Sequence, residues 1–169
     1  MAEPLRLTDC TALTKVLVRG GADGALAAGA PYGRARRDGS LLVGLLPDGW
    51  LVIAPPGSAT DVVDRVDAGR DGGFITVVDV THAYTLVRLT GAAAPSVLEK
   101  VCSIDVAEAA TPDGAVFRSL LAGITASVVR DDEGGTRSYL LLCDRSYGQY
   151  LVDVLLDAGA EYDIGVHPH

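Results

Sequence analysis

The chain has 169 residues, of which 49% are hydrophobic and 5% aromatic, and its formal net charge is −8 at pH 7. This length fits one domain with a substantial apolar core. The negative charge repels polyphosphate and the few aromatic rings provide little base stacking, so we expect no nucleic-acid partner. Three cysteines without C-x-x-C spacing indicate neither a disulfide framework nor a zinc site. An odd number of cysteines with no pairing signal fits a reducing cytoplasm. Because the apolar runs are only strand-length, we expect the protein to be neither secreted nor membrane-spanning.

The first apolar segments predict a strand and then a β-hairpin. Residues 13–18 are aliphatic and β-branched and stop at the glycine pair 20–21, after which an Ala-rich stretch favours a short helix. Apolar runs at 41–46 and 50–54 flank Pro47-Asp48-Gly49, which is a typical turn sequence between paired strands. We therefore expect these two runs to form an antiparallel hairpin.

A helix and two strands are expected next. Ser58 is placed as the N-cap of the helix, with Asp61 positioned to reach back to it as in a capping box, and Gly69 ends the helix. Residues 74–80 and 84–89 are rich in β-branched and aliphatic types. Both segments predict strands.

The second part of the chain continues this alternation. Gly91 introduces a helix with Pro95 in its first turn, where the missing N–H costs nothing. Further strands are predicted at 116–121, 124–129 and 139–143, each bounded by glycine-containing turns.

The last predicted strand and helix match an earlier part of the chain. The helix begins at Ser146, with Gln149 in the same capping-box position, and closes at Gly159. Stretches 50–69 and 139–159 share, in the same order, an aromatic residue, an aliphatic run, a serine, a Val-Asp pair and a terminal Ala-Gly. The alternative to duplication is a chance similarity of two amphipathic hairpin-helix segments.

We therefore predict an α+β fold made of two diverged β-α-β-β-α units. The halves cover about residues 12–70 and 74–160 of a single domain, 1–169. Two such units pair their antiparallel strands into sheets with helices on one face.

Three residues near the middle of the chain are candidates for catalysis. His82 is the one histidine outside the C-terminal tail, and Asp79 and Tyr84 lie close to it in the sequence. A histidine beside a carboxylate can transfer a proton near neutral pH. The alternative is a structural histidine at a strand end. His167 and His169 lie in a tail that we expect to fray, and their spacing alone cannot complete a metal site, so no metal is expected.

Two further groups can bind an anion or an acidic partner. Neighbouring arginines carry guanidinium groups that hold carboxylate or phosphate through two hydrogen bonds. A strand-to-helix junction can offer free backbone N–H groups to an anion. The alternatives are a solvated loop and a simple helix cap with local packing. The candidate residues for ligand or partner binding are Arg34, Arg36, Arg37, Asp144, Arg145 and Tyr147.

The order of several short motifs resembles a known fold family. Asp79-Val80-Thr81-His82, a strand that ends in Gly91, a helix with Val97-Leu98 and the strand at 139–142 follow one another. This order is similar to the folate-binding domain of glycine-cleavage aminomethyltransferases, whose pattern runs from D-x-S-H to a strand ending in glycine and then a helix. The resemblance implies the fold of that domain.

A closer resemblance is to the gamma subunit of heterotetrameric sarcosine oxidase. The motifs that add to it are Arg19-Gly20-Gly21 and the W-L-x-x-x-P strand at 50–55, and the similarity runs from about residue 16 to 160. It implies that this chain binds no cofactor itself and that larger flavoprotein subunits hold FAD, FMN, NAD and tetrahydrofolate while they oxidise N-methyl amino acids. A homo-oligomer is the alternative assembly.

One position departs from the aminomethyltransferase pattern. Thr125 stands where those enzymes carry an acid that methylene transfer requires, and a neutral hydroxyl cannot replace a carboxylate in that role. The resemblance therefore implies a non-catalytic gamma-type subunit of a sarcosine oxidase-like complex. The alternatives are a stand-alone enzyme or small-molecule-binding protein on the same fold, and a folate-binding module that has lost catalysis.

Overall fold

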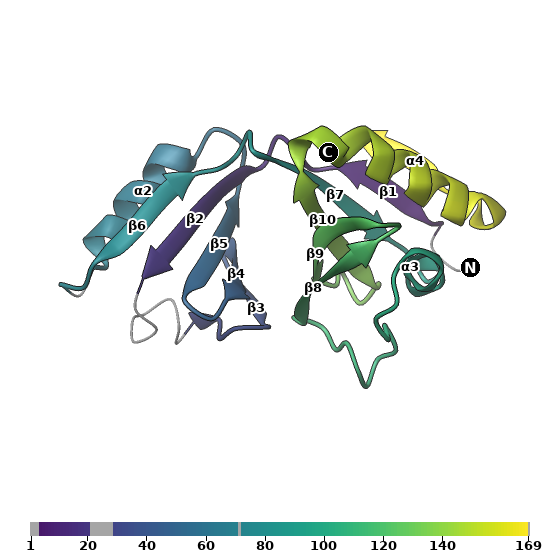
Figure 1. Ribbon diagram of the computed structural model, residues 1–169, viewed down its shortest axis with the longest axis horizontal. Helices are drawn as coiled ribbons and strands as arrows, with labels where there is room; N and C mark the ends of the chain where they lie inside the picture. The colour runs from purple at the N-terminus through teal and green to yellow at the C-terminus, as the bar shows by residue number, and fades with distance from the viewer. Residues whose placement is uncertain (1–3, 21–28, 71, 169) are drawn as a thin grey trace. The chain divides into compact units, whose positions relative to one another are not determined.

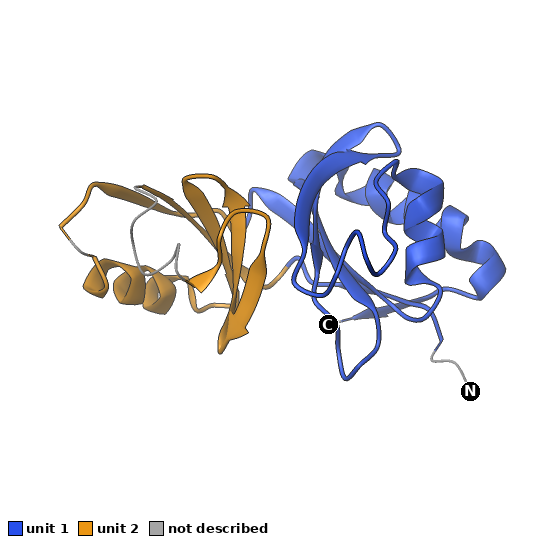
Figure 2. Cartoon of the chain, turned by 90° about the horizontal axis from the view of Figure 1, so that it is seen from below, with its two compact units in different colours: residues 1–11, 82–169 blue, residues 12–81 orange. Residues whose placement is uncertain are grey.

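The computed structural model describes residues 4–20, 29–70 and 72–168, and Figure 1 labels most of its helices and strands. The chain divides into two compact units, which Figure 2 colours separately. We call Ala12–Thr81 the inner unit, and Met1–Thr11 together with His82–His169 the split unit. The Ala-rich helix predicted after residue 20 lies outside the described residues.

The inner unit is an antiparallel sheet with strand order β3-β4-β5-β2-β6. Helix α2 packs on one face of it, where Val62 of the helix contacts buried side chains of β2 and β5 such as Val16 and Val52. The elements are β2 (Thr14–Gly20), β3 (Ala35–Asp38), β4 (Ser40–Leu46), β5 (Gly49–Ala54), α2 (Ala59–Ala68) and β6 (Ile75–Asp79).

Strands β4 and β5 form the predicted hairpin around Pro47-Asp48-Gly49. The register shifts between Gly44 and Leu46. A Cβ atom on Gly44 would collide with the backbone carbonyl of Pro31, so the chain can pass there only because this residue has no side chain.

The split unit is a six-stranded sheet of order β11-β1-β7-β10-β9-β8, antiparallel except for the parallel pair β1–β11. Helices α3 and α4 pack together, and their buried Leu98 and Leu151 join the core over the sheet with Leu89 and Leu141. The elements are β1 (Arg6–Asp9), β7 (Tyr84–Thr90), α3 (Ala94–Val101), β8 (Val116–Leu121), β9 (Ile124–Arg130), β10 (Ser138–Asp144), the 3-10 turn η1 (Arg145–Tyr147), α4 (Gly148–Gly159), the 3-10 turn η2 (Ala160–Tyr162) and β11 (Gly165–Pro168).

The two sheets share a strand order. β8-β9-β10-β7-β1 in the split unit corresponds to β3-β4-β5-β2-β6 in the inner unit, with antiparallel neighbours throughout and a helix after the third strand of each series. In the split unit the place of β6 is taken by β1, which comes from the beginning of the chain. This is the arrangement that a duplicated unit would give, and we retain the duplication as a proposal.

Several local expectations were wrong. Neither capping box forms, because the Ser58 hydroxyl donates to the Pro55 carbonyl oxygen (2.6 Å) and the Gln149 amide donates to Asp153 (2.8 Å). The C-terminal segment does not fray at His167, since β11 pairs with β1. A serine three residues before an acid or a glutamine forms a capping box only where neither side chain has another hydrogen-bond partner close by.

Candidate functional site

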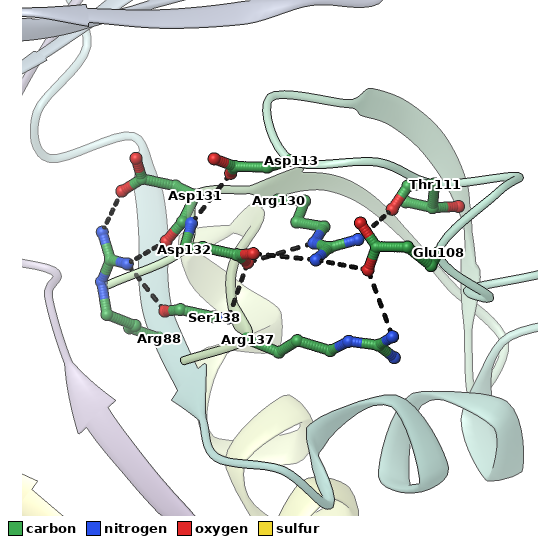
Figure 3. Close-up of polar contacts among 9 residues, drawn as sticks. All are labelled: Arg88, Glu108, Thr111, Asp113, Arg130, Asp131, Asp132, Arg137 and Ser138. Carbon is green, nitrogen blue, oxygen red and sulfur yellow. Dashed lines mark hydrogen bonds and ion pairs between the residues drawn. The ribbon is translucent and has the colours of Figure 1, made fainter. Parts of the chain in front are cut away.

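Arg88 lies within β7, and its side chain is only 10% exposed. One terminal nitrogen donates to a carboxylate oxygen of Asp131 at 2.6 Å. The other donates to the Asp131 carbonyl oxygen at 3.0 Å and to Ser138 Oγ at 2.7 Å, and lies 3.4 Å from the Glu133 carboxylate. Arg88 thereby ties β7 to the first residue of β10 and to the segment that precedes it (Figure 3).

Arg130 ends β9 and is buried more deeply, at 3% exposed. Its Nε and Nη2 donate to the two carboxylate oxygens of Asp132 at 3.0 and 2.8 Å, and its Nη1 donates to the Thr111 carbonyl oxygen at 2.7 Å. Glu108 accepts from both Arg130 (2.8 Å) and Arg137 (3.1 Å), as Figure 3 shows. We call these connected residues the arginine clamp: Arg88, Arg130 and Arg137 with Glu108, Asp131, Asp132 and Glu133.

The clamp satisfies the charges that it buries. A guanidinium loses its hydration on burial, and this cost is offset only when its donors find acceptors of good geometry. All three nitrogens of Arg130 donate to oxygens of the chain. The hydrogen bonds to Asp132 outweigh the burial and raise the pKa of Arg130, so this guanidinium stays charged.

The clamp joins two connecting segments to the sheet. Asp132 accepts from the Ser138 N–H at 3.2 Å, and the Asp132 N–H donates to Asp113 at 3.0 Å. Thr111 in turn donates its hydroxyl to the Asp105 carbonyl oxygen at 2.6 Å. Because the guanidinium groups are directed at acceptors of the same chain, the arrangement is that of a structural brace.

Sequence reasoning missed the clamp. An arginine inside an alternating strand is expected to face water, and neither Arg88 nor Arg130 stands out from that pattern. The usable signal is the run Arg130-Asp131-Asp132-Glu133, in which carboxylates follow directly after an arginine at a strand end.

The three catalytic candidates lie around the turn between β6 and β7. His82 is exposed in this turn, and the Asp79 carboxylate accepts from the Thr81 N–H at 2.9 Å, which shapes the turn. Tyr84 opens β7, is partly buried, and lies opposite Asp144 in the β7–β10 register. The structure thus brings Tyr84 next to Asp144, which is one of the candidates for ligand or partner binding. Asp79 and His82, in contrast, belong to different units.

The candidate arginines lie on and beside β3, at the edge of the inner sheet. Arg36 and Arg37 pair with β4, and all three arginine side chains are exposed. Because side chains alternate along a strand, Arg34 and Arg36 point to one face and Arg37 points to the other. Two of the three can therefore address the same anion.

The third candidate group lies where β10 passes into α4. Asp144 ends the strand, Arg145 and Tyr147 form the 3-10 turn η1, and the helix begins at Gly148 instead of the predicted Ser146. The Arg145 N–H donates to the Ala83 carbonyl oxygen at 3.0 Å, so this amide is used within the fold. Tyr147 is 47% exposed.

A shallow groove lies between Lys100 of α3 and Tyr150 and Asp157 of α4. Lys100 donates to the Ala158 carbonyl oxygen at 2.7 Å and binds Glu161, and the latter hydrogen bond raises the pKa of Lys100. The cation of the groove is therefore engaged within the chain.

Two kinds of feature are absent from the described residues. No group of three or more His, Cys, Asp or Glu side chains among them could hold a metal ion. Within residues 4–20, 29–70 and 72–168, no helix has the length and hydropathy needed to cross a bilayer.

A family model described as "Sarcosine oxidase, gamma subunit family" matches residues 34–161, which extend through both units. The chain belongs to this sarcosine oxidase gamma subunit family. The resemblance that the sequence motifs indicated is thereby confirmed.

Named relatives and solved structures agree with the family. Sarcosine oxidase subunit gamma of Corynebacterium sp. strain P-1 is 30% identical over 125 residues, which are 74% of this chain and 59% of that protein. A chain of heterotetrameric sarcosine oxidase from Corynebacterium sp. U-96, in complex with pyrrole 2-carboxylate, has a TM-score of 0.81 at 24% identity over 95% of this chain and 86% of its own. Glycine cleavage system aminomethyltransferase T from Bartonella henselae has a TM-score of 0.74 at 15% identity over 96% of this chain and 47% of its own.

These likenesses confirm the predicted α+β fold of the aminomethyltransferase type. The match spans about three fifths of the length of the curated relatives. Thr125, which departs from the aminomethyltransferase pattern, lies exposed on β9 opposite Leu120 of β8, one residue from the turn that joins these strands.

Proposed function

We propose that this protein is a non-catalytic gamma-type subunit of a heterotetrameric sarcosine oxidase-like flavoenzyme complex, which oxidatively demethylates N-methyl amino acids. The observation that carries the proposal is the family match over residues 34–161. The likeness in fold to a chain of the heterotetrameric enzyme supports it. In this proposal the complex is cytoplasmic, and larger partner subunits hold FAD, FMN, NAD and tetrahydrofolate while this chain holds none of them.

The arginine clamp suits a docking role. A hydrogen-bonded ionic network around two buried arginines can fix one arrangement of the groups that it joins, which we offer here as a hypothesis for this protein. By holding segments 105–113 and 131–138 on the sheet, it presents a surface that does not have to be ordered when a partner binds. Preorganisation of this kind lowers the entropic cost of association.

Co-expression with the large flavoprotein subunits of a sarcosine oxidase tests the proposal. We expect the tagged chain to elute with the flavin absorbance in size-exclusion chromatography. A chain that stays monomeric and captures none of these subunits would contradict the proposal.

Two measurements distinguish the alternatives. His82→Ala and Arg36→Ala should leave sarcosine turnover by the complex unchanged, whereas turnover by the isolated chain that either variant abolishes would favour a stand-alone enzyme. Saturable tetrahydrofolate binding to the isolated chain would contradict the assignment of that cofactor to the partners.

A further inference from the structure

The groove between α3 and α4 has an apolar base. Val101 of α3 and Val154 and Ala158 of α4 line it and are half-buried. Tyr150, Val154 and Ala158 follow one another at intervals of four residues on α4, so they form a single ridge along the flank of α4 that adjoins α3. Ridges of this spacing are surfaces against which another helix packs.

Tyr150 is fixed at this groove with much of its ring uncovered. Its hydroxyl donates to the Ala122 carbonyl oxygen at 2.8 Å, in the turn between β8 and β9, and the residue is 47% exposed. Aromatic side chains that are apolar over the ring and bonded at the polar end supply much of the binding energy at interfaces. Because the hydrogen bond already orders this side chain, a partner that covers the ring loses little rotamer entropy.

The groove carries uncompensated negative charge. Asp153 and Asp157 line it, are exposed, and lie one helical turn apart, about 6 Å along the axis of α4. Neither forms an ion pair within the part of the chain that the structure describes, and the hydrogen bond that Asp153 accepts comes from the neutral amide of Gln149. Lys100, the one cation among the described residues that line the groove, is already bound to Glu161. The groove is therefore complementary to two cations one turn apart.

The shape and charge of the groove limit what can bind there. The groove is shallow, whereas a small-molecule pocket encloses most of the surface of its ligand. A second copy of this chain has no matching helix among the described residues, since α2 carries one basic residue, Arg65, α3 carries Lys100, and α4 carries none. The net charge of −8 also makes two copies repel each other. These observations favour a helix of another polypeptide.

We propose that the groove binds a basic amphipathic helix of a partner polypeptide. The apolar face of that helix packs on the ridge of Tyr150, Val154 and Ala158. Two basic residues one turn apart on the partner pair with Asp153 and Asp157. Apolar packing supplies the affinity, and the charges set the register of the helix in the groove. Only the source of the helix, a larger subunit, rests on the proposed function.

The isolated chain tests the groove with a labelled peptide that has leucine along one helical face and lysine beside it. Fluorescence anisotropy measures its dissociation constant. Two control peptides of the same length carry glutamate in place of lysine, or a central proline that breaks the helix. We expect saturable binding of the lysine peptide and affinities at least about tenfold lower for both controls. No saturable binding of the lysine peptide, or equal affinity for either control, overturns the proposal.

Matched variants locate the peptide at the groove. Asp153→Asn and Asp157→Asn keep the shape of the side chain, and each weakens binding about threefold, because an exposed ion pair is lost. Tyr150→Ala weakens binding about tenfold, because it removes the aromatic anchor, and the asparagine variants decide the question if this variant does not fold. Asp64→Asn is the control, since it makes the same charge change at an exposed residue of α2 that does not line the groove. Equal losses at Asp64 and at the two groove positions overturn the proposal.

The complex separates this inference from the proposed function. Peptide binding without capture of the flavoprotein subunits overturns the proposed function and leaves the groove as a helix site. A complex that the Asp153→Asn, Asp157→Asn double variant assembles with unchanged affinity overturns the larger subunit as the source of the helix and leaves the subunit role. A dimer of the free chain that the same double variant dissociates assigns the groove to a second copy and overturns the proposal.

Discussion

The guanidinium of Arg130 and the carboxylate of Asp132 meet through two hydrogen bonds, Nε to Oδ1 at 3.0 Å and Nη2 to Oδ2 at 2.8 Å. The same Oδ1 accepts the Ser138 N–H at 3.2 Å, so one carboxylate connects the end of β9 with the start of β10. A side-on pair of this kind sets the relative orientation of both groups.

Arg130→Met is expected to lower the free energy of unfolding by about 3–5 kcal/mol, because it leaves the Asp132 carboxylate without its partner in a site that is 17% exposed. Urea denaturation followed by circular dichroism measures the change. Arg137→Met is the control, since its side chain is 35% exposed and its loss should cost about 1 kcal/mol or less. Equal losses in the two variants would contradict the role of the buried pair.

Tyr139→Phe is expected to raise the free energy of unfolding by about 1 kcal/mol. Tyr139 is fully buried, and its hydroxyl has no hydrogen-bond partner among the described residues. The substitution removes an unsatisfied polar group and keeps the ring. Tyr139→Leu, which also removes ring contacts, should lower the free energy of unfolding by about 1–3 kcal/mol. Thermal unfolding of both variants measures the two changes. A destabilised Phe variant would show that the hydroxyl is bonded.

Stability should fall between pH 9 and pH 11. Burial raises the pKa of the Cys10 and Cys143 thiols from 9.0 to about 11, and at Cys10 the neighbouring Arg88 opposes this rise. An acid whose pKa is higher in the folded state contributes stability that is complete below the unfolded value and is lost as the pH rises through the folded value.

The free energy of unfolding falls by at most about 3 kcal/mol for each thiol, because the pKa differs by about two units and each unit corresponds to about 1.36 kcal/mol. The Cys10→Ala, Cys143→Ala double variant should show a flatter decline across this range, measured against its own value at pH 7 so that lost packing is removed. Identical slopes for both proteins would exclude the thiols as the cause.

Gly44→Ala is expected to lower the free energy of unfolding by about 1–3 kcal/mol, because the new methyl group meets the rigid backbone of Pro31. Gly73→Ala is the matched control, with no atom within 4 Å of its added Cβ. Differential scanning calorimetry of both variants checks the contrast. Similar melting temperatures would mean that the β4 backbone can move aside.

The sequence was sufficient for elements whose signals are local. The Pro47-Asp48-Gly49 turn and the apolar runs beside it predict the β4–β5 hairpin that the structure contains. The turn between β8 and β9 follows in the same way from Gly123, although Ala122 also takes a positive φ of 48° there. Such turns depend on two or three adjacent residues.

Elements that depend on distant partners could not be predicted in this way. β1 has four residues, and its strand character comes from pairing Arg6 with Thr90 on one side and with Gly165 on the other. The clamp is hidden for the same reason, since Arg88 meets Asp131 across a gap of 43 residues. A periodic pattern within one segment carries no information about such contacts.

The division of the split unit has a consequence for synthesis. β1 is made before both of its neighbours, because β7 and β11 follow only after the whole inner unit. The inner unit can close as soon as residue 81 has emerged, because domains generally fold as units during translation. β1 must therefore wait for β7, and the ladder β11-β1-β7 is complete only when Gly165–Pro168 has also been made.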